Sequence, residues 1–356
     1  MRALSATECI TPAIERTKRI LFAPFRKGRT WKLAATAYVS VMGSFFLPVP
    51  LAILALPWVP TPDKMGRGAF TLLFLFFVLF ETAFIWLFFY FGARLQFVLF
   101  DIVLFKAEFV APVWRKYKPQ AWRWIGLKAA FGTAITLIAG IPLAAWSIHA
   151  FSRLAVQPGQ PPPPGFVAGF LLTTFIVMGW FSLYLLVTSL LGDFVLPSLA
   201  LESTSLSDAI SRSMALLKAE PAQVFYFSCL KVVLAIAGFI ALEIVVFIGE
   251  IAIGIPVGIV GFVGWLSLHN LGAAGALMMT AGGVILYLGV IAALFYLIIG
   301  LQGCLITFFQ CYGMYFLGGR YPLLGSLLEP PPLRQPAPAP LLPDLPPPMP
   351  LESGAL

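Results

Sequence analysis

Six stretches of this sequence are long enough and apolar enough to cross a lipid bilayer. A helix that spans the hydrocarbon core needs about 20 mainly apolar residues, and only helices and closed barrels satisfy their backbone hydrogen bonds there. The predicted spans cover about 33–58, 69–93, 126–149, 167–192, 224–250 and 273–300. The sequence therefore predicts an all-α integral membrane protein whose centre is a six-span helical bundle.

The composition excludes an ordinary soluble domain. Hydrophobic residues make up 60% of the chain and charged residues 11%, whereas soluble domains average about 45–50% and about 25%. The chain has two histidines and four cysteines, and neither type is clustered. Metal centres and disulfide frameworks need such clusters, so we expect no metal and no cofactor.

The apolar region after Ile251 is too long for one span and must be divided. Glycines and a proline weaken any helix over 254–268, which we interpret as a short outer or re-entrant segment, although a seventh span is the alternative. His269 and Asn270 then predict a polar turn, and 300–318 predicts a helix on the inner surface.

Four glycines recur at helical intervals within that segment. They are Gly254, Gly258, Gly261 and Gly264. Small residues allow membrane helices to approach closely, so close helix packing is the favoured interpretation. An irregular pore loop is the alternative.

The distribution of Lys and Arg predicts the orientation of the chain. Residues 1–32 carry eight of these cations and residues 93–128 carry seven, whereas the opposite loops hold only Lys64, Arg67 and Arg153. Cytoplasmic loops are enriched in Lys and Arg. We therefore expect a multi-pass protein of a bacterial inner membrane with both termini in the cytoplasm.

The chain divides into one membrane domain and a tail. Residues 1–328 contain all six predicted spans, whereas 329–356 are rich in proline. Such a composition is typical of extended or disordered segments, so we expect a disordered cytoplasmic tail.

The sequence contains signs of a threefold internal repeat. Three alanines spaced 98 residues apart each begin a similar segment, and each segment leads to a lysine at the start of an apolar run. The alanines are Ala13, Ala111 and Ala209, and the lysines are Lys32, Lys128 and Lys231. Gln96-Phe97-Val98-Leu99 is also echoed by Asp193-Phe194-Val195-Leu196. We predict three units of an interfacial helix followed by a two-span hairpin; chance similarity between apolar segments is the alternative.

Two of the interfacial helices have recognisable first residues. Thr11 precedes a proline, which is typical of a capped helix start. Ser205 lies three residues before Asp208 and resembles a capping box. Amphipathic helices of this kind lie in the plane of the membrane surface, where basic residues contact anionic lipid, although they could equally brace the spans from below.

Eight basic residues are candidate lipid-surface anchors. They are Arg16, Arg19, Lys32, Arg94, Arg115, Lys118, Lys128 and Lys231. Lys231 lies two turns inside its span and is expected to snorkel to the inner head groups. Basic and aromatic residues alternate in the linker near Trp114, but positive-inside charge and interfacial tryptophans explain this pattern without a nucleic acid partner.

Two carboxylates lie within predicted spans. Glu81 and Glu243 form the candidate intramembrane polar site, because a charged group at the centre of a span costs on the order of 3 kcal/mol on insertion scales. The functional interpretation is a proton or cation site. The alternative is a hydrogen-bonded carboxyl group packed between helices.

Several short segments resemble uncharacterised bacterial multi-pass membrane proteins and the membrane domain attached to some glycerophosphodiester phosphodiesterases. The segments are 13–25, 94–97, Asp101, 112–115, 193–195 and 308–312. The resemblance implies a six-helix bundle of unassigned role. The phosphodiesterase chemistry belongs to a separate soluble domain, so the resemblance implies no catalytic residues here.

These features predict a non-enzymatic protein that organises membrane lipids or partner proteins through its basic cytoplasmic helices. Expected partners are lipids and membrane or cytoplasmic proteins. A transporter or channel for a small solute or ion, using Glu81 and Glu243, is the alternative.

Overall fold

The computed structural model describes residues 2–23, 25–44, 66–106, 109–146, 165–202 and 204–329. Within these ranges every regular element is a helix and none is a strand, which confirms the predicted all-helical class. The predicted tail and the second half of the first predicted span lie outside the described residues.

The described part of the chain alternates short and long helices. In order these are α1 (Ile10–Phe22), α2 (Lys27–Met42), α5 (Arg67–Phe105), α6 (Val110–Lys116), α7 (Lys118–Ile135), the π-helical turn η2 (Thr136–Gly140), α9 (Phe166–Glu202), α10 (Leu206–Ala219), α11 (Pro221–Leu268), the 3₁₀ turn η3 (His269–Leu271), α12 (Gly272–Gly318) and α13 (Pro322–Leu328). Four segments are long and apolar enough to cross a membrane: Arg67–Phe105, Lys118–Trp146, Phe166–Glu202 and Pro221–Gly318. The last of these contains both α11 and α12.

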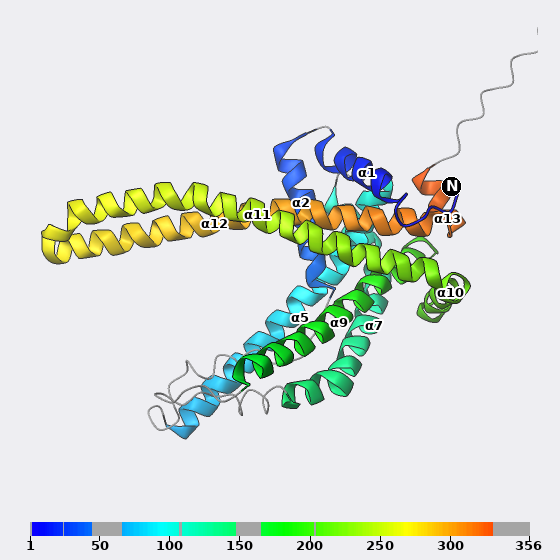
Figure 1. Cartoon of the computed structure of the whole chain (residues 1–356), viewed down its shortest axis with the longest axis horizontal. Coiled ribbons are helices and arrows are strands. Elements are labelled where there is room, and N and C mark those ends of the chain that lie inside the picture. Colours follow the sequence, from blue (N-terminus) through cyan, green and yellow to red (C-terminus); the bar gives the residue numbers. More distant parts are fainter. Residues whose placement is uncertain are drawn as a thin grey trace, which may run out of the picture.

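The long helices form two arms that diverge from a common centre. α11 and α12 make one extended hairpin, and α5, α7 and α9 run together in another direction (Figure 1). Large apolar side chains along both arms are exposed: Leu72 is 70%, Phe175 is 72% and Leu277 is 73% exposed. Apolar surface on this scale is stable only against lipid or other protein.

The tightly packed core lies where the arms meet, and we call this region the helix junction. It consists of residues 2–23, α6, α10 and α13 with the adjoining parts 93–106, 118–128, 193–202, 221–231 and 303–321 of the long helices. Phe97, Trp124, Phe227 and Tyr312 are at most 1% exposed there. The junction therefore holds the helices in fixed relative positions.

Two glycines allow α2 to fit between the arms. A Cβ atom added to Gly43 would lie 2.0 Å from the backbone nitrogen of Ala93 in α5. One added to Gly303 of α12 would lie 2.2 Å from the carbonyl oxygen of Ala34 in α2. No side chain fits at either position, so glycine permits the close approach.

The structure corrects the predicted division after Ile251. α11 continues without a break through 254–268, with Pro256 inside it, and the polar turn at His269 and Asn270 is confirmed as η3. The expected inner-surface helix at 300–318 is the end of α12. In an apolar segment the backbone must bond to itself, and this requirement outweighs the weak helix propensity of glycine and proline.

The predicted close packing of the four glycines is also corrected. A Cβ atom at Gly254, Gly258, Gly261 or Gly264 would meet nothing within 4 Å. These glycines line no contact between helices among the described residues.

The structure confirms one of the two predicted helix starts and corrects the other. Ser205 is the N-cap of α10, and its hydroxyl accepts a hydrogen bond from the Asp208 backbone nitrogen at 3.2 Å, as predicted. α1 begins earlier than Thr11, with Cys9 as its N-cap residue and no side-chain cap. Pro12 still lies in the first turn, where it interrupts no helical hydrogen bond.

Candidate functional site

A buried lysine joins α7 to α5 and α2. Lys128 is 3% exposed, and its Nζ donates hydrogen bonds to Gln96 Oε1 at 2.8 Å and to the Gly43 carbonyl at 2.7 Å. The same Gln96 oxygen accepts a bond of 2.8 Å from Trp124 Nε1, and the Lys128 ammonium lies 4.7 Å from the Trp124 ring centroid. Both hydrogen-bond acceptors of Lys128 Nζ among the described residues are therefore neutral groups.

A second buried lysine joins α11 to α9. Lys231 Nζ forms a hydrogen-bonded ion pair with Asp193 Oδ2, and the two side chains are 11% and 7% exposed. Helix α12 approaches this pair closely, because a Cβ atom at Gly313 would lie 2.6 Å from Asp193 Oδ1. A charge buried in this way destabilises the fold if its partner is missing. Each residue therefore compensates the buried charge of the other.

The two lysines belong to matching groups, which we call the lysine clusters. Each contains a lysine, an aromatic residue four positions before it, a polar residue on the preceding long helix, and a phenylalanine that follows the polar residue. The members are Lys128, Trp124, Gln96 and Phe97 in one cluster and Lys231, Phe227, Asp193 and Phe194 in the other. The two rings meet edge-on in both, at centroid distances of 6.5 Å and 6.0 Å.

The third lysine of the sequence pattern is different. Lys32 is exposed, and a glycine occupies the position four residues before it. No such cluster forms around it among the described residues.

Arg16 caps two helices from inside the protein. Its Nε donates to the Val103 carbonyl at 2.8 Å, Nη2 donates to the Leu104 carbonyl at 2.8 Å, and Nη1 donates to the Leu328 carbonyl at 3.3 Å. These carbonyls end α5 and α13, where the helix dipole favours a cation.

Arg94 has an equally internal role. Its guanidinium donates to the Tyr90 hydroxyl at 2.8 Å and to the Trp114 carbonyl, and it stacks 4.0 Å from the Trp114 ring centroid. Arg94 therefore attaches α6 to α5 by both hydrogen bonding and cation–π contact.

These contacts place four of the eight expected lipid-surface anchors inside the protein. Arg16, Arg94, Lys128 and Lys231 are buried and bonded to protein groups. Burial without such partners would leave an uncompensated charge, so the fold supplies them. The other four candidates, Arg19, Lys32, Arg115 and Lys118, are exposed, and Arg19 lies 3.4 Å from Glu15.

Asp101 forms a further polar contact that was not predicted from the sequence. Its Oδ1 accepts hydrogen bonds from Lys116 Nζ at 2.7 Å and from the Tyr117 hydroxyl at 2.6 Å. Burial, followed by the bond to Asp101, raises the pKa of the Tyr117 phenol, which therefore keeps its proton and donates it. An aspartate inside an apolar helix is the signal that could have predicted this contact.

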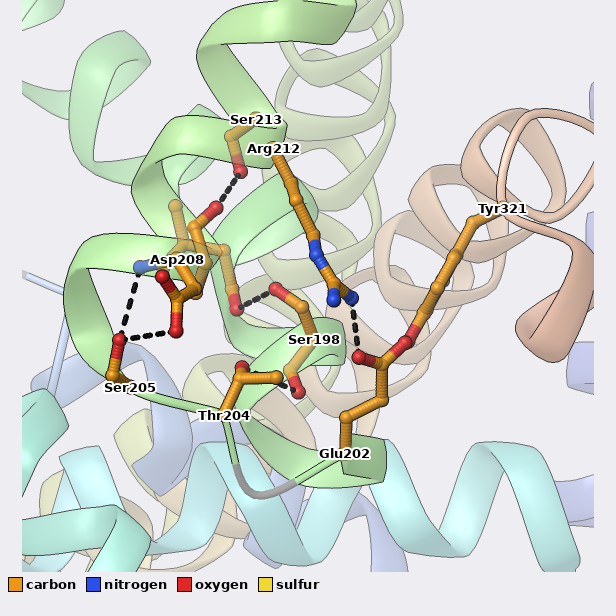
Figure 2. Close-up of polar contacts among 10 residues, drawn as sticks. Ser198, Glu202, Thr204, Ser205, Asp208, Arg212, Ser213 and Tyr321 are labelled. Carbon is orange, nitrogen blue, oxygen red and sulfur yellow. Dashed lines mark hydrogen bonds and ion pairs between the residues drawn. The ribbon is translucent and has the colours of Figure 1, made fainter.

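A last polar cluster connects the ends of α9 and α10 to α13. Glu202 accepts hydrogen bonds from Arg212 and from the Tyr321 hydroxyl, and Ser205 and Asp208 form the neighbouring helix cap (Figure 2). Burial and the contact with Glu202 raise the pKa of the Tyr321 phenol. The cluster therefore links three elements through one carboxylate.

The structure does not bring the two candidate carboxylates together. Glu81 is half-buried in α5, whereas Glu243 is exposed on α11, in the other arm (Figure 1). Neither residue lines either of the two hollows described next.

Two hollows flank α1. One is a groove of about 350 Å³ between α1, α11 and α12, with apolar walls and Lys18 as its one charged residue. The other, of about 440 Å³, contains the cations Arg16, Arg19 and Lys106 together with Glu15 and Glu329. Arg19 pairs with Glu15 there, whereas the first hollow contains no carboxylate beside Lys18.

Comparison with known proteins shows the family of the chain. No curated protein and no solved structure matches it. The family match provides no link to the membrane domain of glycerophosphodiester phosphodiesterases. The chain belongs to DUF7544, a family of unknown function whose model matches residues 4–327.

Proposed function

We propose that this protein is a non-enzymatic, six-span protein of a bacterial inner membrane that organises lipids and partner proteins at its cytoplasmic face. In this proposal the helix junction lies at the inner leaflet, both termini are cytoplasmic, and the two arms cross the hydrocarbon core.

The observation that carries the proposal is the distribution of cations in space. Among the described residues, Arg67 is the only Lys or Arg outside the helix junction and residues 26–32, which begin four positions after the end of α1. Arg67 begins α5, whose 39 residues would extend over about 58 Å as a helix. Cations therefore gather at one end of the apolar arms, as the positive-inside rule requires.

The order of the helices supports six spans and a threefold repeat. A short helix followed by two longer ones occurs as α1, α2 and α5, as α6, α7 and α9, and as α10, α11 and α12. The lysine clusters provide independent support, because each connects the end of one such unit to the start of the next. The sequence predicts the first span over 33–58, of which 45–58 lie outside the described residues.

The exposed cations favour a lipid-organising role over transport. Arg19, Lys32, Arg115 and Lys118 remain at the surface, where each would contribute about 1 kcal/mol of attraction to an anionic leaflet. Transport would need a polar path that includes Glu81 or Glu243, and neither contributes to the hollows described above.

Two measurements test the proposal. Single cysteines at Gln160 and Lys118, in a chain without its four native cysteines, would be labelled with a membrane-impermeant maleimide on intact cells. We expect labelling of position 160 at once and of position 118 only after permeabilisation; labelling of 118 in intact cells contradicts the orientation.

Lipids retained by the purified chain should be enriched in anionic species, and replacing Arg19, Lys32, Arg115 and Lys118 together by Gln should remove that enrichment. Equal lipid composition in both proteins contradicts the organising role.

A further inference from the structure

The groove between α1, α11 and α12 has the form of a site for an amphipathic ligand. Ile14 and Lys18 of α1 lie one turn apart on its rim, and Gly238 and Ala241 of α11 face Leu305 of α12 across it. Its volume, about 350 Å³, falls in the range of about 300–1,000 Å³ that is typical of small-molecule sites.

Small residues leave the groove open at the base of the hairpin. α11 and α12 are in close contact there, because a Cβ atom at Gly238 would lie 2.7 Å from Leu305 Cδ1. Ala241 is exposed and fills little of the space above this contact. An extended hydrocarbon chain could therefore lie along the hairpin with apolar side chains on both sides.

The charge at the rim is uncompensated. Lys18 is exposed, and it forms no ion pair or hydrogen bond with any residue that the structure describes. The neighbouring Thr17 hydroxyl is already engaged, because it donates to the Ala13 carbonyl at 2.7 Å. A ligand that fits both features carries an anion directly next to an apolar chain.

We propose that this groove binds an anionic phospholipid of the inner leaflet, with one acyl chain between α11 and α12 and the phosphate beside Lys18. This inference rests on the proposed function, because it requires α1 to lie at the inner leaflet. It goes beyond the general attraction of lipid to a basic surface, because it assigns one lipid molecule to one defined site.

Photo-crosslinking of the reconstituted full-length protein tests the site. Vesicles would contain phosphatidylglycerol or phosphatidylcholine with a diazirine on one acyl chain, and mass spectrometry would locate the crosslinks. We expect crosslinks on 238–245 and 301–308 to favour phosphatidylglycerol by about fivefold, the preference that one lysine near an anionic lipid provides.

Two variants separate the parts of the site. Lys18→Gln should reduce the phosphatidylglycerol preference at these peptides to that of phosphatidylcholine, whereas Lys32→Gln, which changes an exposed lysine outside the groove, should leave it unchanged. Ala241→Phe should fill the groove and remove the crosslinks there, whereas Ala252→Phe, farther along the exposed surface of α11, should not.

The outcomes distinguish this inference from the broader proposal. If Lys18→Gln and Ala241→Phe leave the crosslinks unchanged while the fourfold Gln variant loses anionic lipid, the groove site is wrong and the proposed function stands. If no variant changes the retention of anionic lipid, both are wrong.

Discussion

Lys128 Nζ lies 2.8 Å from Gln96 Oε1 and joins α7 to α5 in the same way that the Lys231–Asp193 pair joins α11 to α9. An edge-to-face pair of aromatic rings belongs to the same cluster in each case. The helix junction is therefore held together in part by two buried lysines.

Removing one member of the buried ion pair should strongly destabilise the protein. Asp193→Ala leaves the Lys231 ammonium buried without its partner, which costs about 3–5 kcal/mol. Replacing both, as Asp193→Leu with Lys231→Met, should recover most of the loss. The free energy of unfolding in mixed micelles measures both effects, and a single variant as stable as the double variant would contradict the pairing.

Lys128→Met should destabilise the junction without leaving an opposite charge unpaired. The substitution removes the donors to the Gly43 carbonyl and to Gln96 Oε1, and an unsatisfied buried group costs about 1–3 kcal/mol. Lys32→Met is the matched control, because an exposed lysine should change stability by less than about 0.5 kcal/mol. The same unfolding measurement in micelles compares them; equal losses would show that Lys128 is not a buried anchor.

Gly303→Ala should disrupt the contact between α12 and α2. The new Cβ would lie 2.2 Å from the Ala34 carbonyl oxygen, and relieving such overpacking costs about 1–3 kcal/mol or more. Gly258→Ala is the control, because a Cβ there meets nothing within 4 Å. Fluorescence-detected size exclusion after heating should show a lower midpoint only for Gly303→Ala. A normal midpoint for that variant would mean that α2 is not held between the arms.

The Cys9 thiol should be unreactive while the protein is folded. Cys9 is 0% exposed, and burial raises the pKa of its thiol to about 12. In detergent at pH 8, maleimide should modify Cys9 only after unfolding. The folded thiol keeps its proton to a higher pH than the unfolded thiol, whose ordinary pKa is 9.0. The free energy of unfolding should therefore fall as the pH rises above that value, and Cys9→Ala should reduce this decrease.

The sequence by itself determined the features that depend on one segment at a time. Helical class, the apolar segments, the turn at His269 and the cap at Ser205 follow from local composition, because a backbone in lipid must bond to itself. The continuity of α11 through Pro256 was not predicted, because the weak helix propensity of glycine and proline indicated a break there. The need of a backbone in lipid to bond to itself outweighs that weak propensity.

Only the tertiary structure decided what each cation does. Arg16 and Lys32 both lie in the basic segment that precedes the first predicted span. Arg16 nevertheless caps carbonyls that lie 87 and 88 residues away, whereas Lys32 is exposed. The contact between Lys128 and Gly43 spans 85 residues. A side chain is buried or exposed according to which distant groups the fold brings within hydrogen-bonding distance, and hydropathy along one segment carries no information about those groups.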